Sequence, residues 1–252
     1  MIFDYPRQEQ IPSLLQLWKS VFGDWNGFWE TFLDTAFSPS RCRCILEENQ
    51  ITAALTWLDC SCENRKMAYI YAVVTHPRYR GQGLCRRLLA DTHALLKDRG
   101  YAAALLVPAE PPLREMYEKL GYQTCSFVEE FTCEAGAEAA PLRAVGPEEF
   151  ARLRRNHLPP LSVLQEEENL SFLASQSQFY AGDDFLMAAA PEEDSLTAME
   201  LLGNTSAAPG ILRSLGVKKG SFRCPGNVTP FAMIHSLQPG IPVPAYLGFA
   251  FD

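Results

Sequence analysis

Residues 80–85, with the sequence RGQGLC, form the segment of this chain that is best suited to hold a ligand. Two glycines let the backbone curve tightly and turn consecutive N–H groups outward. At the start of a helix such groups, together with the positive end of the helix dipole, bind anions. Arginines at positions 78, 80, 86 and 87 add positive charge close by. The segment therefore predicts a cradle for a pyrophosphate.

Two widespread phosphate-binding loops do not match this segment. The dinucleotide-binding loop G-x-G-x-x-G has a third glycine where Arg86 stands in this chain. A P-loop has Lys followed by Ser or Thr after its second glycine, and no such pair is present here. On these residues alone, an anion site and an ordinary glycine turn remain open alternatives.

The elements that must position this loop are a strand before it and a helix after it. Residues 67–77 are rich in β-branched and aromatic side chains and end at Pro77, which predicts a strand. Leucines then recur at helical spacing over residues 84–96. Residues 101–107 are continuously apolar, as in a parallel strand covered on both faces. Together they predict a right-handed crossover between parallel strands.

Residues 1–133 as a whole predict an α/β domain with a mixed central sheet flanked by helices. A short strand, helices within residues 11–22 and 25–33, and a hairpin over residues 42–60 precede the crossover. A helix with an apolar stripe at positions 113, 116, 117 and 120 and a last strand over residues 124–134 follow it. The aromatic stripe of residues 25–33 is expected to be core, with a substrate pocket as the alternative.

The rest of the chain predicts a second, smaller α+β domain. Residues 134–141, EAGAEAAP, are small and acidic and predict a linker. Residues 142–252 predict a helix at 147–158, a hairpin over 184–203, a short helix at 209–216, and strands at 221–224, 230–237 and 245–252. This order loosely repeats that of residues 1–133, but without a second R-x-x-G-x-G loop.

Residues 67–122 resemble the core of the GNAT family of N-acetyltransferases. Residues 80–85 match the family signature R/Q-x-x-G-x-G/A, except that Cys85 stands where the family has Gly or Ala. Residues 117–122 match its second motif, Y-x-x-x-G-F/Y. The resemblance implies a GNAT catalytic domain in residues 1–133 and acetyl-CoA as co-substrate, with no metal. It also suggests that residues 142–252 are a degenerate GNAT-like domain, with a plain α+β domain as the alternative.

The resemblance further implies which residues hold the cofactor. Backbone groups of one strand would bind the pantetheine arm, and the loop with the start of the following helix would bind the pyrophosphate. The residues concerned are Val73, Val74, Thr75, Arg80, Gly81, Gln82, Gly83, Leu84, Cys85 and Arg86.

Tyr117 carries over from the family motif as the general acid that protonates the CoA thiolate. A phenol can protonate a thiolate once the sulfur develops charge. The alternative is a core tyrosine whose hydroxyl is hydrogen-bonded, because Tyr117 lies on an apolar stripe. Glu110 follows the apolar strand and is the tentative base, with His76 and a water relay as alternatives.

The resemblance thus implies an N-acyltransferase that moves an acetyl group to a primary amine of a small molecule or peptide. The alternative is a non-catalytic acyl-CoA sensor or assembly module. With 22 Lys and Arg against 30 Asp and Glu, the chain is a poor candidate for nucleic acid and favours cationic substrates.

The sequence also predicts the cellular location of the protein and the absence of membrane segments and of a metal site. No basic and apolar leader or membrane-length apolar run is visible, so we expect a cytoplasmic protein without membrane segments. The pairs Cys42/Cys44 and Cys60/Cys62 fall outside the usual C-x2-4-C zinc spacing, which favours structural thiols. His93, His157 and His235 show no metal or triad spacing. Dimerisation is among the roles left open for residues 142–252.

Overall fold

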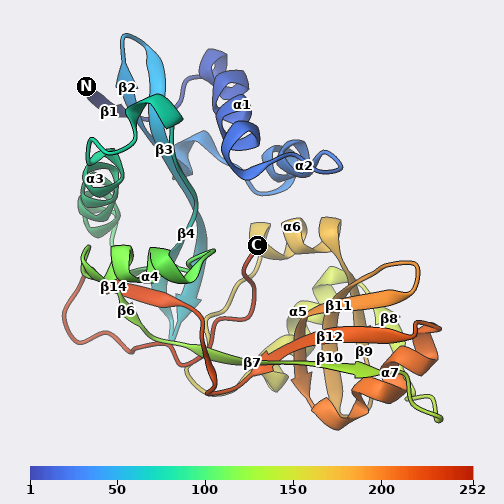
Figure 1. The fold of residues 1–252 in the computed structure, drawn as a ribbon. Coiled ribbons are helices and arrows are strands. Elements are labelled where there is room, and N and C mark those ends of the chain that lie inside the picture. Colours follow the sequence, from blue (N-terminus) through green and yellow to red (C-terminus); the bar gives the residue numbers. More distant parts are fainter. Residues whose placement is uncertain (252) are drawn as a thin grey trace. The chain divides into compact units, whose positions relative to one another are not determined.

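The computed structural model describes residues 1–251, which form two compact units, each built on a seven-stranded sheet (Figure 1). The first unit consists of Met1–Leu106, Pro112–Gln123 and Ile234–Ile241. The second consists of Val107–Pro111, Thr124–Met233 and the residues from Pro242 onward. Among residues 1–251, no helix has both the length and the apolar character needed to cross a bilayer.

The first sheet and its helices follow the order expected from the sequence. Their elements are β1 (Ile2–Asp4), α1 (Ile11–Phe22), α2 (Phe28–Thr35), β2 (Cys42–Glu47), β3 (Gln50–Cys62), β4 (Arg65–Thr75), α3 (Leu84–Asp98), β5 (Ala103–Leu106), α4 (Pro111–Glu118), β6 (Gln123–Thr124) and, from far along the chain, β14 (Met233–Ser236).

The second sheet and its helices take up most of the remaining chain. Their elements are β7 (Phe127–Glu134), β8 (Arg143–Val145), α5 (Pro147–His157), α6 (Glu168–Gln176), β9 (Gln178–Ala181), β10 (Phe185–Pro191), β11 (Ser195–Gly203), α7 (Ala208–Leu215), β12 (Lys219–Pro225) and β13 (Thr229–Pro230).

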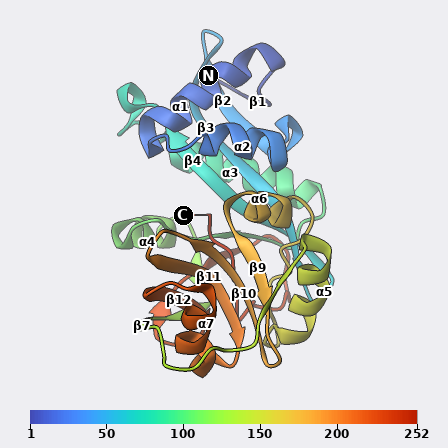
Figure 2. The same ribbon diagram turned by 90° about the vertical axis from the view of Figure 1, so that its right-hand side faces the viewer.

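The first sheet has the order β1-β2-β3-β4-β5-β14-β6 and is mixed, because β4 and β5 are parallel whereas β1 to β4 are antiparallel. Helix α3 packs on one face, and α1 and α2 cover the other (Figures 1 and 2). The aromatic side chains of α2 are mostly core, as expected: Trp29 and Phe32 are buried, although Trp25 before the helix is exposed.

A β-bulge interrupts β4 near the loop. Ala54 pairs with Val74 and Thr56 with Tyr71, so Leu55 stands opposite two residues of β4. One of these, Ala72, has a φ of +51°, which a residue with a side chain rarely adopts. The indole Nε1 of Trp18 donates a hydrogen bond of 3.2 Å to the Ala72 carbonyl. This contact from α1 holds the bulge in place.

Two strands join a sheet other than the one that their place in the sequence suggests. Strand β7 does not join the first sheet; it pairs with β12 over Val128–Glu134 in the second. Strand β14 lies between β5 and β6 in the first sheet. The periodicity of each segment predicts a strand, but not the sheet it joins.

Residues 134–141, expected to be a linker, lie within the second unit and are hydrogen-bonded to its other residues. The Gly136 and Ala140 amides donate to the carbonyls of Pro209 and Gly210 at 2.9 and 3.0 Å. A Cβ at Gly210 would lie 3.0 Å from Ala140. The small residues of this segment therefore allow close packing against α7.

The second unit is a mixed sheet of order β13-β7-β12-β11-β10-β9-β8 flanked by helices, so the half expected to be an α+β domain has the same kind of architecture as the first. Helix α7 packs on one face through Ile211 and Leu212, and α5 contacts β9, β10 and β11. The strand expected at residues 245–252 is not formed over 245–251, where only an isolated bridge joins Ser162 and Tyr246; position 252 lies outside the described residues.

A fully buried ion pair joins α5 to β11 in this unit. Arg154 donates from Nε and Nη2 to the Glu200 carboxylate at 2.6 and 2.8 Å, and Tyr246 donates to the same carboxylate at 3.0 Å. Replacing Arg154 by methionine is expected to lower the free energy of unfolding by about 3–5 kcal/mol, because Glu200 would keep a buried, unpaired charge. Urea denaturation measures this loss.

The matched control is Arg155→Met, which removes the neighbouring but solvent-exposed pair with Glu166. Exposed pairs contribute no more than about 1 kcal/mol, so this variant should unfold almost like the wild type. Equal losses for the two variants would contradict the assigned role of the buried pair.

Candidate functional site

A pocket of about 490 Å³ opens in the first unit where β4 and β5 separate. The end of β4, the loop after it and the facing sides of α3 and α4 line it. Nine of the ten residues predicted to hold the cofactor line this pocket, and so does Tyr117. Gln82 is exposed and does not line it. Two sequence motifs more than thirty residues apart thus meet in one cavity.

The separation of the two strands leaves hydrogen-bonding groups available in the pocket. The pairing of β4 with β5 runs only from Met67 to Tyr69 within the described residues, whereas β4 continues to Thr75. On its other edge β4 remains paired with β3 through Val74 and Thr75. Backbone groups on the open edge of β4 can therefore bind an extended amide chain, much as a further strand would.

The loop between β4 and α3 has the geometry of an anion site. Gly81 and Gly83 have φ values of +78° and +72°, which favour glycine, and no atom lies within 4 Å of a Cβ built on either. Gly83 is the N-cap of α3, and no side chain caps the helix there. The first N–H groups of this helix therefore remain available to an anion, beside Arg80 and Arg86.

Tyr117 is 7% exposed, and α4 presents it to the pocket together with Leu113 and Met116, while Leu120 lines the pocket from the turn after the helix. The apolar stripe of α4 therefore faces the cavity. Burial, with a smaller effect of Cys85, raises the pKa of Tyr117 well above its ordinary value. The phenol is thus protonated at neutral pH, as a general acid must be.

Cys85 lies in the first turn of α3, and its half-buried side chain lines the same pocket. Burial raises the pKa of its thiol. A neutral, small side chain at this position is compatible with an anion bound to the loop N–H groups. Val21, Tyr79 and Lys119 also line the pocket, and no local sequence pattern predicts them there.

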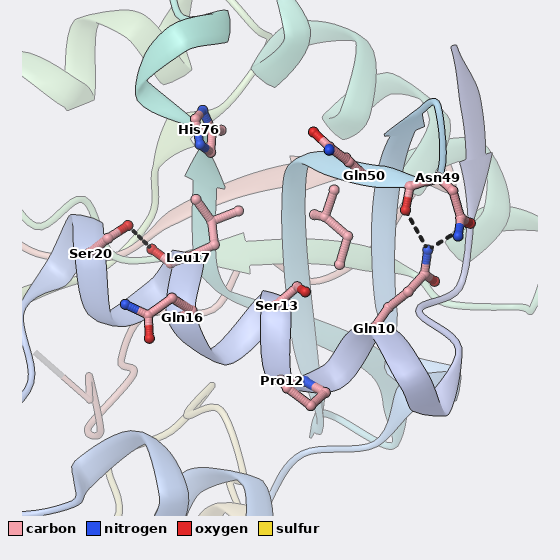
Figure 3. Close-up of a pocket in the computed structure, with 10 residues that line it drawn as sticks. Gln10, Pro12, Ser13, Gln16, Leu17, Ser20, Asn49, Gln50 and His76 are labelled. Atoms are coloured by element: carbon pink, nitrogen blue, oxygen red, sulfur yellow. Dashed lines mark hydrogen bonds between the residues drawn. The ribbon is translucent and has the colours of Figure 1, made fainter.

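The predicted bases do not line this pocket. Glu110 is exposed. His76 begins the short helical turn after β4, where its Nδ1 accepts a hydrogen bond of 3.3 Å from the Arg78 amide. His76 instead lines a neighbouring pocket of about 600 Å³, between α1 and the β2–β3 turn (Figure 3). The buried side chain of Gln10 also lines that pocket and donates hydrogen bonds to the backbone and side-chain oxygens of Asn49.

The corresponding helix start in the second unit is built differently. Before α7, the Asn204 side chain accepts a hydrogen bond from the Ser206 amide at 3.0 Å. It also donates one of 2.8 Å to the Asp184 carboxylate. Asn204 caps the short helical turn Thr205–Ala207 that leads into α7, whereas α7 itself has no side-chain cap; a capping side chain and a negative charge thus precede this helix, where α3 has a glycine loop.

Comparisons with known proteins agree with this geometry. The family model described as the acetyltransferase (GNAT) domain matches residues 3–125. A comparison with curated proteins gave no match.

Solved structures share the fold over nearly the whole chain. A GCN5-related N-acetyltransferase from Anabaena variabilis ATCC 29413 is 16% identical with a TM-score of 0.74, covering 94% of this chain and 73% of its own. One from Kribbella flavida is 17% identical with a TM-score of 0.72, covering 93% and 70%. A tandem GNAT protein from the clavulanic acid biosynthesis pathway is 11% identical with a TM-score of 0.59, covering 95% and 99%. Residues 3–125 therefore match the GNAT acetyltransferase domain, and the chain as a whole has the fold of proteins with two GNAT-like halves.

Proposed function

We propose that this protein is an N-acyltransferase that moves an acetyl group from acetyl-CoA to a primary amine of a small molecule or peptide. The observation that carries the proposal is the pocket in which the open edge of β4, the glycine loop and Tyr117 come together. The uncapped start of α3 and its arginines fit a pyrophosphate, and the edge of β4 fits an amide-containing arm. The eight cysteines are free, in keeping with a cytoplasmic location.

Different residues of the pocket would bind the cofactor and donate the proton that the reaction needs. Bound acetyl-CoA would supply the thioester and, as the acyl group leaves, a thiolate. Backbone groups of Val73, Val74 and Thr75 would fix the arm, so that the carbonyl is held for attack by the amine. Tyr117 would donate its proton to the sulfur as the C–S bond breaks.

A primary amine must lose a proton before or during attack. We keep Glu110 as the proposed acceptor because it directly follows the apolar strand, although its side chain does not line the pocket. Replacing Glu110 by glutamine is expected to lower kcat about 100-fold near neutral pH, the low end of what a general base contributes. The loss should shrink as pH rises, because more of the amine is then free base. Rates measured from pH 6 to 10 at saturating acetyl-CoA test this.

Glu115→Gln is the matched control, because Glu115 is an exposed carboxylate of the same region. It should behave like the wild type at every pH. If Glu110→Gln also has the wild-type rate at every pH, Glu110 is not the base, and a water relay or His76 replaces it in the proposal.

The proposed function itself is tested by following free thiol. The protein is incubated with acetyl-CoA and a panel of polyamines, amino acids, aminoglycosides and peptides. Release of thiol that requires one of these amines supports the transferase. Tight acetyl-CoA binding without turnover on any amine would instead favour a non-catalytic acyl-CoA sensor over the transferase.

That the protein forms a homodimer stays a prediction.

A further inference from the structure

Two histidines that the reaction does not use stack on one another in the first unit. His93 lies on α3 and His235 on strand β14. Their rings are parallel to within 13°, with centroids 4.1 Å apart. His93 is 9% exposed and His235 is half-buried. Nothing in their sequence spacing indicates this pairing.

Each histidine holds the turn that follows the helix of Tyr117. The Nε2 atom of His93 lies 2.7 Å from the Tyr122 hydroxyl, and Nδ1 of His235 donates to the Gly121 carbonyl at 3.1 Å. Gly121 has a φ of +86°, and a Cβ there would lie 3.1 Å from the His235 ring. The glycine and the second tyrosine of the Y-x-x-x-G-Y motif are thus the two residues that the imidazoles contact.

The same turn fixes Tyr117. The amides of Leu120 and Tyr122 both donate to the Tyr117 carbonyl, at 2.9 and 3.1 Å. The ring of Tyr122 packs edge-on against that of Tyr117, with centroids 5.6 Å apart. A shift of the turn would therefore move the phenol within the pocket.

The stack is suited to a permanent structural contact. Burial, and to a smaller extent His235, lowers the pKa of His93 to about 3. His93 is therefore neutral throughout the physiological range, so the two rings do not repel each other as cations. The proton on Nδ1 of His235 is fixed by its carbonyl partner, since a carbonyl only accepts.

We propose that His93 and His235 are positioning residues for Tyr117: they clamp the Gly121–Tyr122 turn, so that β14, from the far end of the chain, is part of the acyl-transfer site. This inference rests on the proposed role of Tyr117 as general acid. It assigns residues 233–236 a function in the first unit, although they follow the whole of the second sheet in the sequence.

The test compares His235→Phe with His235→Asn. Phenylalanine keeps a ring on His93 but removes the N–H that holds Gly121, whereas the Nδ2 of asparagine can replace that donor. We expect His235→Phe to lower the single-turnover rate of acetyl transfer about 10- to 100-fold, since small misplacements of a catalytic group are costly. The acetyl-CoA Kd should stay unchanged, and His235→Asn should recover most of the rate.

A double variant separates positioning from general loss of structure. Once Tyr117→Phe has removed the acid, His235→Phe should cause almost no further loss of rate. An equal loss with and without Tyr117 would overturn the inference. His157→Phe is the matched control, because the Nδ1 of His157 also pairs with a backbone carbonyl, that of Leu153 at 3.0 Å, but in the second unit.

Hydrogen exchange tests the clamp without any reaction. In His235→Phe, the amides of residues 120–122 should exchange faster, while those of α3 and of the second unit keep the wild-type rate. Unchanged exchange at residues 120–122 would overturn the clamp, whatever the activity. If the wild type transfers no acetyl group to any amine, the proposed function fails, and exchange alone then decides whether the clamp exists.

Discussion

Replacing Gly83 by glutamate is expected to weaken acetyl-CoA binding at least about 100-fold, because like charges brought together at a binding site cost several kcal/mol. Gly83 lines the pocket and caps α3, and the space around its missing side chain is empty. A carboxylate built there would meet the phosphates at the point where the loop N–H groups should hold them. Isothermal titration calorimetry with acetyl-CoA measures the loss without depending on turnover.

Two controls separate charge from backbone strain in this experiment. Gly83→Ala introduces a side chain at the same φ of +72° without a charge, so any loss it causes reports strain. Gly100→Glu places the same carboxylate at the other end of α3, where φ is +79° and the surroundings are also open. It should bind acetyl-CoA like the wild type. Unchanged affinity in Gly83→Glu would overturn the assignment of the loop as the pyrophosphate site.

The parts of the site that sequence could predict are those with local causes. Gly81 and Gly83 are needed for the backbone of one loop, and the apolar stripe around Tyr117 follows from the period of one helix. Continuous apolar character marks β5 as a strand covered on both faces. These signals depend on neighbours within about eight residues, so a single sequence contains them.

The parts that sequence could not predict depend on distant partners. The sequence of residues 124–134 and 230–237 predicts two strands. However, β7 joins the second sheet and β14 joins the first, the reverse of what their positions along the chain suggest. Ala72 adopts a left-handed backbone conformation that its residue type does not predict, unlike a glycine or an asparagine. The hydrogen bond from Trp18 of α1 to the Ala72 carbonyl stabilises it. His93 and His235 meet only because β14 returns to the first sheet. Each of these features is set by packing across the sheet, which local propensity does not encode.

Replacing Tyr117 by phenylalanine is expected to lower the rate of acetyl transfer about 100- to 1,000-fold, within the range that a general acid contributes. The ring would remain against Tyr122, so the pocket should keep its shape and its affinity for acetyl-CoA. Because burial raises the pKa of Tyr117, the wild-type enzyme should show no loss of the acid form below about pH 10, the ordinary value for tyrosine. Single-turnover measurements keep product release from hiding the effect on the chemical step.

Tyr5→Phe is the control for this variant, because it removes a tyrosine hydroxyl that pairs with Arg99 away from the pocket. Its rate should match that of the wild type. Tyr117→Phe should also lose less with a thioester whose thiol is more acidic, since a better leaving group needs less help from an acid. A full rate with acetyl-CoA in Tyr117→Phe would contradict proton donation by this residue, and the loop and strand contacts would then account for binding alone.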